Sequence, residues 1–114
     1  MIAMARLRVM TTGVAALLAG GLAVAADPQP APFVHGDAAV GKTLSDRDCV
    51  ACHAQRMAGD ADRMYLRADR RVHTPQQLMA QIRYCNSQLR TAYFPREEED
   101  VAAYLNSRFY RFKP

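Results

Sequence analysis

Two cysteines and a histidine stand within five consecutive residues, in the order Cys49-Val50-Ala51-Cys52-His53. Two thiols and an imidazole so close in the chain are the strongest constraint on the fold, because a group held by all three must lie directly against this segment. The chain has one further cysteine, Cys85. If the protein is exported, an odd number of cysteines requires an explanation, because the compartments that receive exported proteins oxidise thiols.

The five residues match the attachment site of a covalently bound haem. In such a site the two thiols add across the two vinyl groups of the porphyrin, and a two-residue spacer matches the distance between those groups. The histidine that follows comes under the iron and supplies an imidazole nitrogen. We therefore expect one haem c, bound through Cys49 and Cys52, with His53 as the first axial metal ligand. The same two cysteines could also form a redox dithiol or half of a zinc site. A redox dithiol would need a strand-to-helix context, and zinc would need a second pair of ligands, and the sequence indicates neither.

Residues 1–26 are typical of a secretory signal peptide. A short basic start with Arg6 and Arg8 precedes the uncharged, apolar residues 9–26, and Ala23-Val24-Ala25 is a small-x-small cleavage pattern. A membrane anchor that stays uncleaved is the alternative, and the cleavage pattern favours removal. We therefore expect export to the periplasm.

The mature chain is short and nearly neutral. Removal of 26 of the 114 residues leaves 88, and so small a domain usually needs a disulfide, a metal or a cofactor for stability. Without Arg6 and Arg8 the charge of +4 falls to +2. The sequence has no basic stripe with interleaved aromatic residues, so we expect no nucleic-acid partner. Beyond the leader, no apolar run is long enough to span a membrane.

The mature chain divides into a linker and one domain. Residues 27–35 hold three prolines and are expected to form an extended linker. Residues 36–114 are expected to form an all-α domain of three or more short helices around one covalently bound haem. Within it, residues 57–71 are expected to be a loop with short turns.

Three segments have helical patterns. The first runs from Gly36 to about Asp48, with Asp37 as its N-cap. The second begins with Thr74 as N-cap and Pro75 at the first helical position. Its apolar stripe consists of Leu78, Ile82, Cys85 and Leu89. The third begins at Pro95, with acidic residues in its first turn. Its apolar stripe consists of Val101, Leu105, Phe109 and Phe112.

Both ends of the domain resemble class I cytochromes c. The segment from Gly41 to Leu44, followed by Asp48 to His53, resembles their first helix, and the segment from Asp100 to Leu105 resembles their last. In that family a glycine of the first helix lets an aromatic residue of the last helix cross it closely, and those positions match Gly41 and Tyr104. The resemblance covers most of the mature domain and is thin between residues 54 and 75.

The usual second axial ligand of that family has no counterpart here. Class I cytochromes c place a methionine just before the last helix, where this chain has Tyr93-Phe94-Pro95. The segment from Arg83 to Ser87, followed by Pro95-Arg96-Glu97, resembles cytochrome c″ and the SHP-type cytochromes. In that group a histidine or asparagine directly before a disulfide-bonded cysteine binds the iron. Tyr84 and Tyr93 occupy the ligand position and the disulfide partner's position, so neither feature carries over.

The second axial ligand therefore stays open. The candidates are Met79, Tyr84, Asn86, Met57, Met64 and His73. An iron with no second protein ligand is a further alternative, in which Tyr84 would donate a hydrogen bond to a bound gas. Cys85 lies on the apolar stripe and is interpreted as a small buried hydrophobic residue, with an intermolecular disulfide as the alternative.

Three arginines, Arg67, Arg70 and Arg71, surround Asp69 in the predicted loop. They form either a solvated surface or a site where one guanidinium pairs with a haem propionate, because its forked donors suit a carboxylate. We favour the propionate for one of the three.

These features predict a periplasmic monohaem cytochrome that carries single electrons between redox protein partners and is not an enzyme. The residues supply no Ser/His/Asp set and no catalytic pair of carboxylates. Two other functions are compatible with the motif. One is a haem protein that binds oxygen, nitric oxide or carbon monoxide, and the other is a haem subunit of a larger respiratory or sulfur-oxidising complex.

Overall fold

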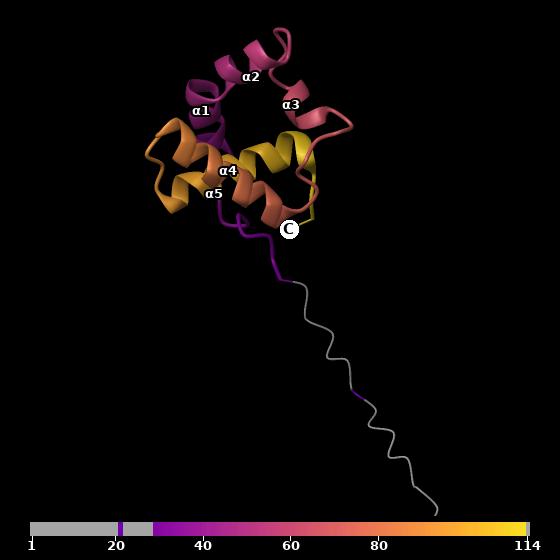
Figure 1. Cartoon of the computed structure of the whole chain (residues 1–114). Coiled ribbons are helices and arrows are strands. Elements are labelled where there is room, and N and C mark those ends of the chain that lie inside the picture. Colours follow the sequence, from indigo (N-terminus) through magenta and orange to yellow (C-terminus); the bar gives the residue numbers. More distant parts are fainter. Residues whose placement is uncertain (1–20, 22–28, 114) are drawn as a thin grey trace, which may run out of the picture.

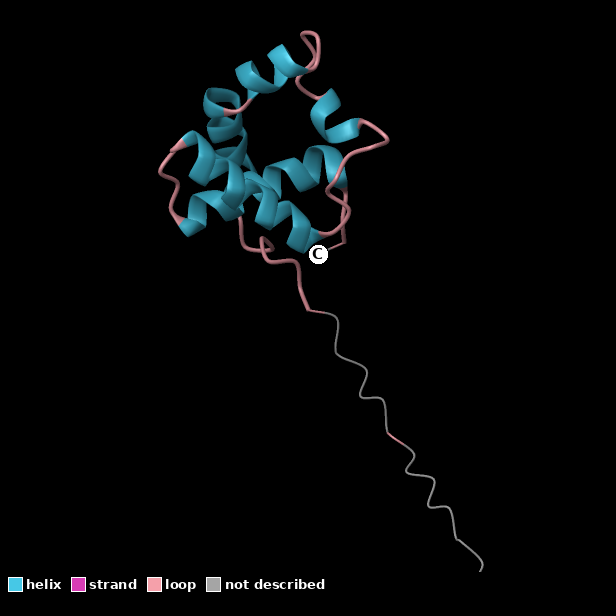
Figure 2. Cartoon of the chain, in the orientation of Figure 1, coloured by secondary structure: helices cyan, strands magenta, loops and turns pink. Residues whose placement is uncertain are grey.

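The computed structural model describes Gly21 and residues 29–113. The predicted signal peptide therefore lies, apart from Gly21, outside the described residues. The described chain is all-α and contains no strand (Figures 1 and 2). Its elements are α1 (Ala38–Asp48), α2 (Val50–Arg56), α3 (Arg63–Leu66), α4 (Pro75–Leu89), α5 (Pro95–Leu105) and the short π-helical segment η1 (Asn106–Tyr110).

The predicted helix starts follow from capping. The Asp37 carboxylate accepts hydrogen bonds from the backbone N–H groups of Ala39 and Val40, at 2.9 and 3.2 Å, so α1 begins two residues later than the predicted Gly36. Thr74 accepts from the backbone N–H of Gln77, and Pro75 occupies the first position of α4. Pro95 likewise opens α5.

The third predicted helix is divided. After α5 the chain changes to the π-helical segment η1, and Arg111 ends it in the left-handed conformation with φ 59°. The side chain of Asn106 accepts from the backbone N–H of Phe112 at 2.8 Å and donates to its carbonyl at 3.1 Å. This pair of bonds turns the chain end back onto the domain, where Phe112 packs against the buried cluster.

Two glycines, Gly41 in α1 and Gly36 just before it, lie directly against α5. A Cβ atom on Gly41 would overlap the backbone carbonyl of Asp100 and lie 2.9 Å from the Cβ of Tyr104. A Cβ atom on Gly36 would overlap the carbonyl of Glu99 in the same way. The predicted close contact between Gly41 and Tyr104 is therefore confirmed, and Gly36 adds a second one that the sequence did not indicate.

Part of the expected linker belongs to the packed domain. Ala31 and Phe33 are each only 3 % exposed, and backbone hydrogen bonds from Val34 to Ala31 and from Gly36 to Phe33 close a turn there. The expectation of an extended linker over residues 27–35 is thus wrong for its second half, because two apolar side chains cover the buried core.

The segment between α1 and α4 contains more helix than expected. Helix α2 follows α1 after Cys49 alone, and the predicted loop over residues 57–71 contains α3. Figure 1 shows α1, α2 and α3 arranged as an arc, with α4 and the end of α5 facing the inside of that arc. Among the described helices, none has the length and apolar character to cross a membrane.

We predict that Gly41→Ala destabilises the protein by about 1–3 kcal/mol, because the added methyl group forces the two helices apart. Thr43→Ala is the matched control on an exposed position of the same helix and should stay within about 0.5 kcal/mol of the wild type. Urea unfolding followed by circular dichroism measures both. An alanine at position 41 without a stability loss would show that the crossing is not as close as described.

Candidate cofactor cavity

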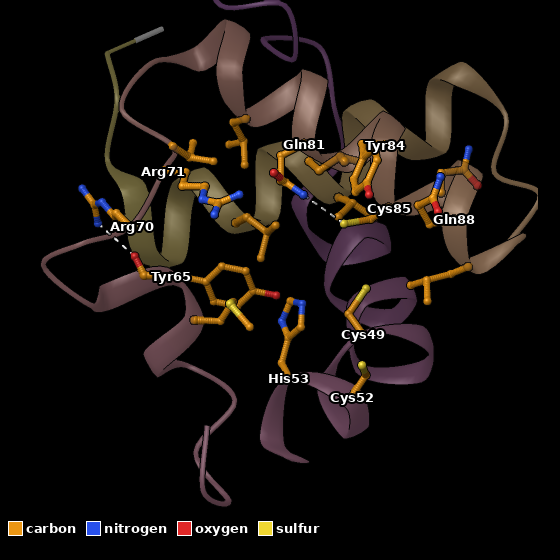
Figure 3. Close-up of a pocket in the computed structure, with 18 of the residues that line it drawn as sticks. Cys49, Cys52, His53, Tyr65, Arg70, Arg71, Gln81, Tyr84, Cys85 and Gln88 are labelled. Atoms are coloured by element: carbon orange, nitrogen blue, oxygen red, sulfur yellow. Dashed lines mark hydrogen bonds between the residues drawn. The ribbon is translucent and has the colours of Figure 1, made fainter. Parts of the chain in front are cut away.

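A cavity of about 770 Å³ lies inside the arc of helices. This volume is in the range of small-molecule and cofactor sites, roughly 300–1,000 Å³. One wall carries Cys49, Cys52 and His53, and the opposite wall is formed by α4 (Figure 3). Apolar side chains line its interior, among them Val72 from the loop before α4, Leu78 from α4 and Val101 from α5.

The three motif residues meet because the chain bends at Cys49. This residue ends α1 and starts α2, with φ −113° and ψ −39°, and its backbone N–H donates to the carbonyl of Ser45 at 2.9 Å. Cys52 and His53 follow in the first turns of α2. The structure therefore brings all three predicted site residues to one cavity wall, with both thiols free and partly buried.

The pKa of the Cys49 thiol is shifted in the opposite direction to that of a reactive cysteine. Burial, supported by the charge of Asp48, raises its pKa to about 11. Catalytic and redox-active cysteines have lowered pKa values, because the thiolate is the nucleophile. The described chain also lacks the strand that a dithiol enzyme would place before its helix. These features disfavour the redox-dithiol interpretation.

The imidazole of His53 is suited to act as a ligand. Burial, and secondarily the charge of Arg56, lowers the pKa of His53, which favours the neutral ring with an available lone pair at neutral pH. Its Nδ1 atom is buried and has no hydrogen-bond partner. The ring lies edge-on against Tyr65 at 5.2 Å between centroids, and Tyr65 stacks on Phe109 at 4.7 Å. Aromatic packing therefore orients the imidazole.

The cavity has a cationic wall. Arg67, Arg70 and Arg71 all line it, together with Arg56, and no acidic side chain is among the described lining residues. Asp69 is 82 % exposed at its side chain and lies 3.6 Å from Arg67 Nε, beyond hydrogen-bond distance. Arg67 Nε is itself buried without a hydrogen-bond partner.

Arg70 is held more firmly than its neighbours. Its Nη1 donates to the carbonyl of Tyr65 at 3.0 Å, and its guanidinium lies 5.1 Å from the centre of the Tyr110 ring. The arginine cluster thus faces an apolar cavity, which suits a ligand with an apolar body and carboxylate groups.

The candidates for the second axial ligand separate into two groups. Tyr84, Asn86, Met57 and Met64 line the cavity, whereas Met79 and His73 do not. Met79 is 1 % exposed and belongs to the packed core. His73 lies before α4, where its backbone N–H donates to Gln77.

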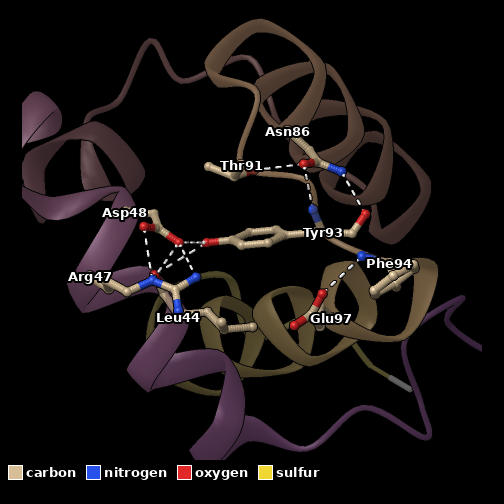
Figure 4. Close-up of polar contacts among 8 residues, drawn as sticks. All are labelled: Leu44, Arg47, Asp48, Asn86, Thr91, Tyr93, Phe94 and Glu97. Atoms are coloured by element: carbon tan, nitrogen blue, oxygen red, sulfur yellow. Dashed lines mark hydrogen bonds and ion pairs between the residues drawn. The ribbon is translucent and has the colours of Figure 1, made fainter.

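Asn86 lines the cavity but is committed to structure (Figure 4). Its Nδ2 donates to Glu98 Oε1 at 2.8 Å and to the carbonyl of Tyr93 at 3.1 Å. Its Oδ1 accepts from the Thr91 hydroxyl at 2.6 Å and from the backbone N–H of Tyr93 at 3.0 Å. With both polar atoms engaged twice, this amide holds the α4–α5 loop.

Tyr93 links that loop to the motif. Its hydroxyl donates to Asp48 Oδ2 at 2.5 Å and also lies 3.3 Å from the carbonyl oxygen of Leu44 (Figure 4). Asp48 directly precedes Cys49, so the contact ties the α4–α5 loop to the position where the first motif cysteine enters the cavity wall. The sequence contained no signal for this contact, because the two residues are 45 positions apart.

The prediction that Cys85 is a small buried hydrophobic residue of the core is wrong. The residue is partly exposed and lines the cavity from α4. Its stripe faces the cavity as well as the core, which periodicity alone does not distinguish. Gln81, which the sequence analysis did not single out, donates from Nε2 to Cys85 Sγ at 3.3 Å (Figure 3).

Comparisons with known proteins add no relative to this picture. No protein-family model, no curated protein and no solved structure matches the chain. Across residues 29–113, no group of three or more His, Cys, Asp or Glu side chains lies in position to hold a metal ion by itself.

We predict that Asp48 gives the protein a pH-dependent contribution to stability. The Arg47 guanidinium and then the Tyr93 hydroxyl hold the pKa of Asp48 below its usual value of about 4. A lowered folded-state pKa stabilises the fold above about pH 4, and this contribution is lost as the pH falls through the folded-state value. In urea unfolding, the wild type should therefore lose stability below about pH 4 more steeply than Asp48→Asn.

Tyr93→Phe removes one of the two groups that lower the pKa of Asp48, so its loss of stability below about pH 4 should lie between those of the wild type and Asp48→Asn. At pH 7 this variant should be about 1 kcal/mol less stable than the wild type. Asp69→Asn, at an exposed carboxylate, is the control and should retain the wild-type pH dependence. Equal acid sensitivity of the wild type and Asp48→Asn would show that the contact contributes nothing to stability.

Proposed function

We propose that this chain is a periplasmic monohaem c-type cytochrome that carries single electrons between redox protein partners. The observation that supports it most is the convergence of Cys49, Cys52 and His53 on one wall of a cofactor-sized, largely apolar cavity. The five-residue motif and the all-α fold are both compatible with this assignment. The Gly41–Tyr104 contact supports the resemblance to class I cytochromes c.

The residues present fit a haem. Cys49 and Cys52 would each form a thioether with a vinyl group, and His53 would supply the axial imidazole. Arg67, whose Nε makes no hydrogen bond, and Arg71, which also lines the cavity, would pair with the propionates. When bound, the haem iron supplies a one-electron couple between its ferric and ferrous states.

The chain's own contribution is to orient the imidazole and exclude water. Tyr65 packs against the edge of His53 and is buried, and Phe109 supports it from behind. Leu78, Ile82 and Val101 give the cavity an apolar lining that suits a porphyrin face. Such a lining lowers the local dielectric constant, and haem reduction potentials depend on burial as well as on the ligands. No substrate chemistry is needed for electron carriage.

Expression with an export signal in a host that matures c-type cytochromes tests the proposal. The wild type should retain its pigment on a denaturing gel and through acid acetone extraction, because thioether bonds survive both. The double variant Cys49→Ala/Cys52→Ala should lose covalent haem completely. Cys85→Ala is the matched control, since it removes a cysteine of the same cavity outside the motif, and it should retain covalent haem. A colourless or fully extractable wild type would contradict the proposal.

The iron spin state and redox cycling separate the carrier from the alternatives. A carrier should be low-spin in its ferric form and cycle reversibly by one electron in a voltammetric experiment. A high-spin, ligand-exchangeable iron would favour a protein that binds small gases. Co-purification with a large partner would favour a subunit of a complex.

A further inference from the structure

The cavity-facing surface of α4 has a cysteine at its centre. At 3.6 residues per turn, the lining residues of α4 occupy one broad face of the helix. The flank on one side carries the apolar residues Leu78, Ile82 and Leu89, with Asn86 at its edge. The flank on the other side is polar and consists of Gln81, Tyr84 and Gln88. Cys85 lies between these flanks, so its side chain is the one that α4 directs most squarely toward the cavity.

Cys85 also lies across the cavity from His53. Figure 3 shows the imidazole on the α2 wall and the Cys85 thiol on the α4 wall, with the cavity between them. A planar cofactor attached at Cys49 and Cys52 and ligated by His53 would therefore turn its other face toward α4. The buried Nδ1 of the imidazole is paired with no group of the described chain, so no hydrogen bond within these residues commits the ring to a structural role.

The other candidates fit this position less well. Met79 lies in the packed core, and both polar atoms of Asn86 are engaged in the α4–α5 loop. Tyr84 stands at the edge of the lining face of α4 and is 61 % exposed. Met57 and Met64 come from the α2–α3 side, the same side as His53.

We propose that Cys85 is the second axial ligand of the haem iron, opposite His53. The inference rests on the proposed function and extends it to the ligand set. The sulfur would bind as a thiolate, so the thiol proton is released to solvent and no electron is exchanged in the step. The hydrogen bond from Gln81 Nε2 to Cys85 Sγ, at 3.3 Å, is a contact that would stabilise and tune such a sulfur ligand.

The ligand set has a functional consequence. An anionic sulfur offsets the charge of ferric iron more than a neutral thioether does, so it favours the ferric state. The reduction potential of this protein should therefore lie below that of a cytochrome with histidine and methionine ligands. The assignment also accounts for the odd cysteine, since two thiols are used for attachment and the third for the iron.

Electron paramagnetic resonance and absorption spectra of the full, haem-loaded protein test this assignment. The ferric wild type should give a low-spin signal of the thiolate-ligated type with a sulfur-to-iron charge-transfer band. Cys85→Ala should lose both features and become high-spin or bind added imidazole. Cys85→Met should stay low-spin, lose the charge-transfer band and show a higher reduction potential. Tyr84→Phe removes the phenol of a rival candidate ligand and should retain the thiolate-type signal and the charge-transfer band.

Alkylation provides a readout that does not depend on a variant folding. In the ferric wild type, Cys85 should resist iodoacetamide until the protein is denatured, as mass spectrometry of the peptides would show. Alkylation of Cys85 in the folded protein without a spectral change would overturn the inference, as would an unaltered spectrum in Cys85→Ala or the loss of the thiolate-type signal and the charge-transfer band in Tyr84→Phe. In these cases the covalent haem is still present and the proposed function stands. A wild type without covalent haem would overturn both.

Discussion

The close crossing of α1 and α5 is the contact on which the rest of the structure depends. Gly41 in α1, and Gly36 just before the helix, allow the backbone of this segment to lie directly on the carbonyls of Asp100 and Glu99. The contact is reinforced by Asp100, whose buried carboxylate accepts from the backbone N–H of Asp37 at 2.7 Å. Since α1 leads through Cys49 into α2, the crossing fixes where the motif wall stands. Since α5 leads into η1, the same crossing places Phe109 behind Tyr65 and so behind His53.

The domain combines a small core with a large cavity. The largest fully buried side chains, Leu78, Met79 and Val101, come from α4 and α5 alone, whereas the arc from α2 to α3 makes few contacts with other elements. A ligand that fills the cavity would join this arc to α4 and add its own free energy of binding to the stability of the folded chain. Under the proposed function, a covalently attached haem would act as a part of the core that the side chains do not supply.

Local features of the sequence predicted the framework well, because local chemistry determines them. Asp37 and Thr74 cap their helices through their own side chains, and Pro95 starts α5 through its fixed φ angle. The roles of Asn86 and Tyr93 were not predictable in this way, because their partners are brought together by the loop between α4 and α5 and by the end of α1. Cys85 illustrates the limit of periodicity, which identifies an inward-facing stripe without distinguishing a packed core from a cavity lining.

The hydrogen-bonded and unbonded polar groups of the described chain are unevenly distributed between the rest of the fold and the cavity. The buried acids away from the cavity are engaged: Glu98 accepts from Asn86 and Arg83, and Asp100 accepts from Asp37 and Arg96. Two buried side-chain nitrogens of the described chain lack a hydrogen-bond partner, and both belong to residues that line the cavity, His53 and Arg67. A buried polar group without a partner costs free energy. Under the proposed function, a bound haem would bring an iron and two carboxylates to a cavity where an imidazole nitrogen and a guanidinium nitrogen lack hydrogen bonds within the described chain.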